Sequence, residues 1–148
     1  MSSVVEAIAI GARAESDVWG AALRAEPNWQ PVFSPLAPPE LALGLETVYE
    51  AYLTHYGTPR LFEPPDADEA VLLGDYLYAH GLVRVAEAGG VAAVAVLAEL
   101  ISRCAALRAD GLPGDGHAWV DAARALGGNP DDAAVTDALA RHSDRVRP

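Results

Sequence analysis

The stretch that decides the fold is Asp68-Glu69-Ala70-Val71-Leu72-Leu73-Gly74-Asp75-Tyr76-Leu77-Tyr78-Ala79-His80. Its apolar residues fall on every side of a helix of 3.6 residues per turn, which predicts a long buried helix from about residue 66 to 88. Gly74 costs about 1 kcal/mol relative to alanine inside a helix. It therefore indicates that a neighbouring helix approaches closely. Asp75 beside it needs a polar partner, because an unpaired buried carboxylate is costly.

The rest of the chain is also typical of helices, since alanine and leucine dominate and few residues alternate as in a strand. Gly89-Gly90 ends the helix of residues 66–88, so it and the next helix must pack antiparallel. Asn129 and Pro130 fit the first positions of the last helix. The predicted helices are 3–25, 40–56, 66–88, 91–109, 117–126 and 130–142.

Residues 26–39 contain five prolines and are predicted to be an ordered strap rather than a linker. Trp29, Val32, Phe33 and Leu36 give this strap apolar side chains that can pack on the helices. We therefore expect a single all-α domain over residues 1–148, an irregular bundle of about six helices.

Composition excludes some classes of function. The 148 residues carry a net charge of −11, whereas nucleic acids and anionic membranes require a basic patch. No apolar run approaches the roughly 20 residues of a membrane span, and the N-terminus lacks the basic region of a signal peptide. We expect a cytoplasmic protein. Cys104, the single cysteine, excludes an internal disulfide and is predicted to be buried.

Several polar residues are candidates for ligand binding. Asp75, Tyr76 and His80 lie on the 66–88 helix, and Tyr49 and Tyr52 share one face of the 40–56 helix. They are interpreted either as polar contacts that fix helix register or as the polar groups of a pocket for an apolar ligand. The four histidines lie on different predicted helices, so the sequence predicts no metal site and no cofactor.

The stretch from Val71 to Ala79, with its Gly-Asp-Tyr-Leu step, is similar to a helix of the trans-isoprenyl diphosphate synthases (polyprenyl synthetases). The resemblance covers residues 69–109. It implies part of the isoprenoid-synthase fold. That family binds magnesium and diphosphate through two DDxxD motifs, and this chain has neither: Asp131-Asp132 is followed by Val135 where a third aspartate would stand. The chain is more similar to the smaller, non-catalytic subunits of heteromeric members.

These observations lead to two hypotheses. The first is a non-catalytic protein resembling a small or regulatory subunit of a polyprenyl diphosphate synthase. It would form a homo-oligomer, or a heteromer with a prenyl synthase-like catalytic chain, through helix–helix contacts at Leu73, Leu77 and Leu97. The second is a small enzyme or carrier that binds an isoprenoid-like molecule between the central helices. Because the Asp-rich motifs are absent, the sequence favours the first hypothesis and leaves catalysis open.

Overall fold

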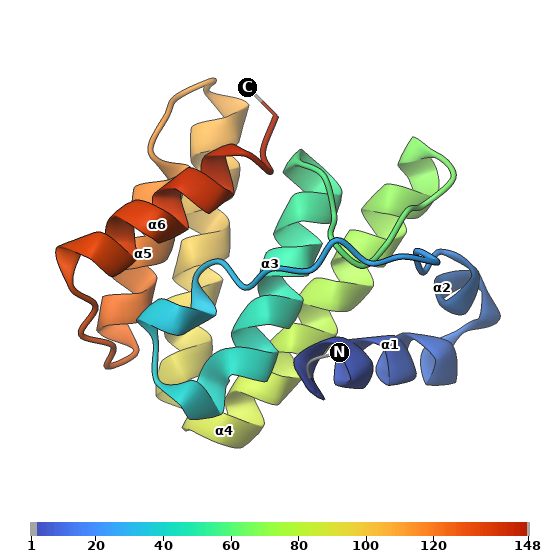
Figure 1. Cartoon of the computed structure of the whole chain (residues 1–148), viewed down its shortest axis with the longest axis horizontal. Helices are drawn as coiled ribbons and strands as arrows, with labels where there is room; N and C mark the ends of the chain where they lie inside the picture. The colour runs from blue at the N-terminus through green and yellow to red at the C-terminus, as the bar shows by residue number, and fades with distance from the viewer. Residues whose placement is uncertain (1–2, 148) are drawn as a thin grey trace.

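The computed structural model describes residues 3–147 and confirms the all-α class (Figure 1). No strand occurs in this range beyond two isolated bridges, Leu23 with Phe62 and Gly57 with Val146. The elements are α1 (Ser3–Glu15), α2 (Asp17–Ala21), the 3-10 turns η1 (Ser34–Leu36) and η2 (Pro39–Leu41), α3 (Ala42–Tyr56), α4 (Ala67–Ala109), α5 (Asp115–Ala125) and α6 (Asp132–Ser143).

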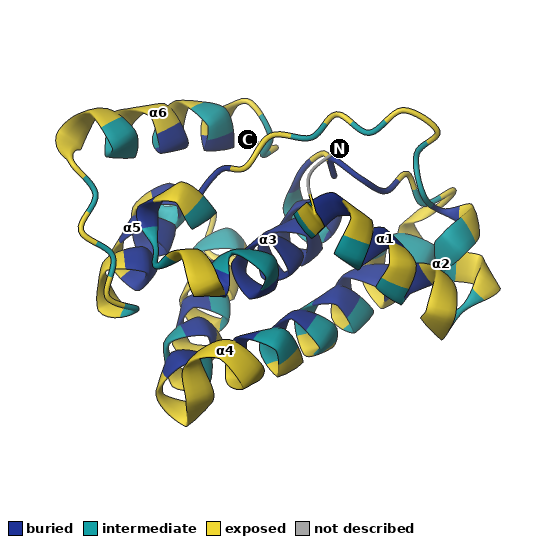
Figure 2. Ribbon diagram, turned by 60° about the horizontal axis from the view of Figure 1, so that its bottom comes forward, coloured by how far each residue is buried: buried dark blue, intermediate teal, exposed yellow. Residues whose placement is uncertain are grey.

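Helix α3 is the centre of the molecule, and every residue from Gly44 to Thr54 is buried. The prediction that the 66–88 helix is buried on all sides is wrong. That first half of α4 buries one face against α3, while Val71, Leu72 and Val83 are more than half exposed. Figure 2 shows exposed residues along the side of α4 turned away from α3. The buried residues of α3 include Glu46 and Glu50, and both carboxylates form ion pairs with the buried Arg60.

Glycines bring α4 and α3 into close contact. A Cβ atom added to Gly81 would lie 2.7 Å from Val48 Cγ2 and 3.0 Å from the Val48 backbone nitrogen. An added Cβ on Gly74 would meet the ring of His55. The close helix approach that Gly74 indicated is therefore present in the structure.

Helix α4 reverses direction at Gly90, where φ is 70° and ψ is −167°. A positive φ suits glycine because it has no Cβ atom. The second half of α4, residues 91–109, runs back from this turn beside α5 (Figure 1). The break at Gly89-Gly90 and the reversal of the chain are therefore as the sequence predicted.

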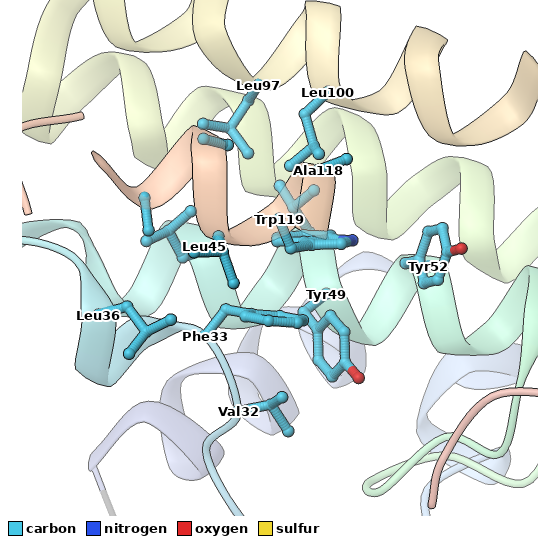
Figure 3. Close-up of a cluster of buried hydrophobic side chains, with 14 of the residues drawn as sticks. Val32, Phe33, Leu36, Leu45, Tyr49, Tyr52, Leu97, Leu100, Ala118 and Trp119 are labelled. Atoms are coloured by element: carbon cyan, nitrogen blue, oxygen red, sulfur yellow. The ribbon is translucent and has the colours of Figure 1, made fainter. Parts of the chain in front are cut away.

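The strap, residues 26–39, is ordered and packs on the helices as expected. Val32, Phe33 and Leu36 are buried, and Phe33 stacks on Trp119 of α5 with ring centroids 5.4 Å apart (Figure 3). The strap therefore contributes to the larger of two apolar clusters, which joins α3, α5 and the second half of α4. A smaller cluster lies between α1, α3, the 57–66 loop and the first half of α4.

Two helix boundaries differ from prediction. The first helix ends at Glu15 rather than near residue 25, because Ser16 adopts an extended conformation and caps the short α2 with its hydroxyl. The last helix is capped by Asp131, whose carboxylate accepts the N–H of Ala134 at 2.8 Å, and not by Asn129. In both cases the boundary is set by the residue whose side-chain oxygen accepts a free N–H group in the first turn of the helix, Ser16 for α2 and Asp131 for α6.

Candidate functional site

The five residues predicted to bind a ligand do not form one site. Asp75 is exposed and lies 3.4 Å from His55 of α3. Tyr76 and His80 lie on the α1 side of α4, where Tyr76 stacks on both Trp19 and His80. Burial lowers the pKa of His80, and the nearby Arg84 lowers it further.

Tyr49 and Tyr52 lie in the larger apolar cluster, on the side of α3 that contacts α5 and α6 (Figure 3). The region between α3 and the first half of α4 is filled by the glycine-mediated contacts described above. A surface hollow lined by Thr54 of α3 and by Ala67 and Ala70 of α4 lies at the end of this region, beside the 57–66 loop, and none of the five predicted residues lines it. This packing argues against a ligand pocket between the central helices.

Leu73, Leu77 and Leu97, the residues predicted to contact a partner, are buried within the chain itself. Leu73 and Leu77 pack in the smaller cluster, and Leu97 packs in the larger one. They pack inside the monomer and are not exposed to a partner.

The structure instead assembles a polar centre around Asp115, at the first turn of α5. Its Oδ2 atom accepts the Tyr52 hydroxyl at 2.5 Å and Arg108 Nη2 at 2.9 Å. The same oxygen lies 3.0 Å from His142 Nε2, and His142 Nδ1 lies 2.7 Å from the Tyr49 hydroxyl. One carboxylate thereby links α3, α4, α5 and α6.

The electrostatics of this centre keep Asp115 ionised. Burial alone would raise the pKa of Asp115, but hydrogen bonds from His142, Tyr52 and Arg108 outweigh burial and leave that pKa well below its usual value. Burial raises the pKa values of Tyr49 and Tyr52, so both hydroxyls stay protonated. A neutral His142 that donates its Nε2 hydrogen to Asp115 accepts the Tyr49 hydroxyl at Nδ1.

A Tyr–His–Asp chain is suited to acid–base chemistry only where its outer end meets a substrate. Here Tyr49 is 1% exposed and its ring packs edge-on against both Phe33 and Trp119. Of the groups that contact Asp115, Arg108 lines a surface hollow of about 400 Å³, together with Tyr56 and Arg147. The Asp115 centre therefore joins four helices, and its Tyr49–His142 end is buried.

A second polar centre is buried completely. Arg60, in the loop after α3, donates Nε to Glu50 at 3.0 Å and Nη1 to Glu46 at 2.5 Å, and all three residues are at most 1% exposed. The guanidinium also lies 4.0 Å from the ring centroid of Trp29. Burial acts to lower the pKa of Arg60, but the two carboxylates outweigh burial and raise it. Every charged group here has its partners inside the chain.

Sequence reasoning identified Tyr49 and Tyr52 but missed their partners. Asp115 lies 63 residues from Tyr52 and 27 residues from His142 along the chain. No local spacing links them, and Asp115 was expected in a loop. In residues 3–147, no group of three or more histidine, cysteine, aspartate or glutamate side chains is arranged to hold a metal ion.

Helix α4 is the feature that these polar centres leave unexplained. Within the described residues it is the one helix long and apolar enough, by length and composition, to cross a membrane. This is weak evidence of a span, because the core helix of a globular protein meets the same criteria. However, only 22% of the most apolar 18-residue window of α4 is buried in the monomer. No protein-family model, curated protein or solved structure matches this chain.

Proposed function

We propose that this protein is non-catalytic and acts through helix–helix association, with the second half of α4 as its contact surface. A single observation carries the proposal: this half of α4 is apolar except for Ser102 and the charged residues Glu99, Arg103 and Arg108, but it buries only one stripe, formed by Ala93, Leu97, Leu100 and Cys104. Such a helix belongs between other helices or at a subunit interface.

The opposite stripe, which we call the outer face of α4, is exposed over its whole length. It consists of Val91, Ala95, Ala98, Ser102, Ala106 and Ala109. Val91 is 87% exposed, the highest value among the large apolar side chains of residues 3–147. The small side chains elsewhere on the face allow the backbone of another helix to approach closely. An exposed apolar face of this kind is typical of an association surface.

The resemblance to polyprenyl synthetases adds a class of partner. Non-catalytic subunits of that family associate with a catalytic chain, and the similarity covers residues 69–109, which lie within α4. We therefore propose a homo-oligomer, or a heteromer with a prenyl synthase-like chain, and regulation rather than catalysis as its role. The absence of DDxxD motifs from the sequence and the enclosed Asp115 centre support this role.

The test is size-exclusion chromatography with light scattering across micromolar concentrations. We expect the wild-type chain to elute as a species larger than its 15.5 kDa monomer. Ala98→Glu should return it to a monomer, because the new carboxylate would be buried without a partner. Ile10→Glu is the matched control: Ile10 is 63% exposed on α1, so this variant should associate like the wild type. A wild-type monomer throughout this range would contradict the proposal.

A further inference from the structure

We infer that the outer face of α4 binds the same face of a second copy of this chain, antiparallel, about a two-fold axis near residue 100. This inference rests on the proposed function and names its partner. Two features of the face support it: the positions of its residues along α4, and the charges on one flank.

The positions are symmetric about the middle of the helix half. In an antiparallel pair related by a two-fold axis, two residues face each other when their numbers have a constant sum. On the outer face, Val91 pairs with Ala109, Ala95 with Ala106, and Ala98 with Ser102, each with a sum within one residue of 200. The four small residues Ala95, Ala98, Ser102 and Ala106 thus lie nearest the axis, two on each side, where the two backbones approach most closely. Val91, the one large residue, lies at the end of the face.

The charges favour this orientation over a parallel one. Glu99 and Arg103 lie on the same flank of the outer face, one turn apart. In a parallel two-fold pair this flank lies on opposite sides of the interface in the two copies, so Glu99 and Arg103 of one copy would not meet those of the other. In the antiparallel pair each Glu99 lies next to the Arg103 of the other copy, as charged residues do along the flanks of coiled coils.

The intramolecular partner of Arg103 does not prevent this exchange. Arg103 lies 3.2 Å from Asp121 of α5, but both side chains are more than half exposed. An exposed pair of this kind contributes about 0–1 kcal/mol, so Arg103 can contact Glu99 of a second copy as well. Between Val91 and Ala106 the helix carries no charged residue besides these two, so the net charge of −11 is located mainly away from the contact.

Charge exchange tests whether this flank lies at the interface. Glu99→Arg alone, or Arg103→Glu alone, places four like charges on the flank and should weaken the dimer about tenfold. An equimolar mixture of the two variants should recover wild-type association. Glu6→Arg, on α1, serves as a control for the change in net charge and should leave the dimer unchanged.

Disulfide trapping tests the orientation, in a Cys104→Ala background. A mixture of Ala95→Cys and Ala106→Cys chains should form a cross-linked dimer under mild oxidation. Neither chain alone should do so, because in the antiparallel pair the two copies of either cysteine lie about 16 Å apart along the helix axis, beyond the reach of a disulfide. Circular dichroism confirms that each variant is folded.

The outcomes separate the two proposals. A cross-link from Ala95→Cys chains alone would show a parallel pair and overturn this inference. An associated wild type that forms no cross-link, and is insensitive to both charge variants, would show that another surface is used and would overturn it as well. A wild-type monomer would instead overturn the association on which it rests.

Discussion

The buried Arg60 centre gives the sharpest prediction about stability. Arg60→Met retains an unbranched apolar side chain of similar length but leaves Glu46 and Glu50 with no cation, although both are at most 1% exposed. Glu50 would retain the backbone N–H groups of residues 60 and 61, and Glu46 those of residues 32 and 34. Removing one partner of a buried ion pair costs about 3–5 kcal/mol.

That loss is a large share of the 5–15 kcal/mol that typically stabilises a domain. It should lower the melting temperature by roughly 6–20 °C, since each kcal/mol corresponds to about 2–4 °C in a chain of this size. Urea unfolding followed by circular dichroism measures the free energy directly. Arg13→Met, at an exposed position of α1, is the control and should cost less than about 1 kcal/mol.

A change below about 1 kcal/mol for Arg60→Met would refute the reasoning, because it would mean that water or rearranged donors replace the guanidinium without cost. Replacing Glu46 and Glu50 with glutamine in the same chain should recover part of the lost stability, since the buried charges are then removed. A triple variant less stable than Arg60→Met would contradict this account of the loss as well.

Two further predictions concern the other buried groups. Asp115→Asn should lower the free energy of unfolding by about 1–3 kcal/mol at pH 7. Because the pKa of Asp115 is depressed in the folded state, the stability that it contributes is present above the ordinary aspartate pKa near 4 and is lost as the pH falls below that value. The free energies of unfolding of the two proteins in urea should therefore converge toward pH 2, and a difference independent of pH would contradict this. Burial raises the pKa of Cys104 to about 12, so a thiol reagent at pH 8 should leave the native protein unlabelled and react fully in urea; rapid labelling without urea would show that Cys104 is accessible.

The sequence was sufficient to predict where some of the helices end, although not that the first helix ends at Glu15. Gly57 and Gly90 stop or turn the chain where the structure shows it, and the strap is ordered because its apolar residues had to be buried. These features depend on local chemistry, namely the conformational freedom of glycine and the rigidity of proline.

Local sequence patterns could not predict which helix lies at the centre of the fold. Helix α3 carries Glu46, Thr47 and Glu50 and looks half polar, yet it is buried because Arg60, ten residues beyond Glu50, neutralises it. The 66–88 stretch looks more apolar, yet it lies at the surface with one buried face. Burial depends on which partners the fold supplies.

The Asp115 centre was unpredictable for a related reason. Its members come from four helices, and each residue alone has an ordinary role: Asp115 as an acidic residue in a first turn, His142 as a residue of a last turn. The hydrogen bonds among them exist only after α5 and α6 dock on α3. Tyr49 and Tyr52 were recognised because they share one helix face, which is a local property.

The attachment of the strap has a consequence for the chain's resistance to cleavage. An extended, proline-rich segment between helices is ordinarily a preferred target for proteases, which bind their substrates in open conformations. Here the Gln30 carbonyl accepts Arg60, and the N–H groups of Val32 and Ser34 donate to Glu46. Releasing the strap would therefore expose an ion cluster that is otherwise sealed from water, so cutting at this segment should require cooperative opening of the molecule rather than local fraying.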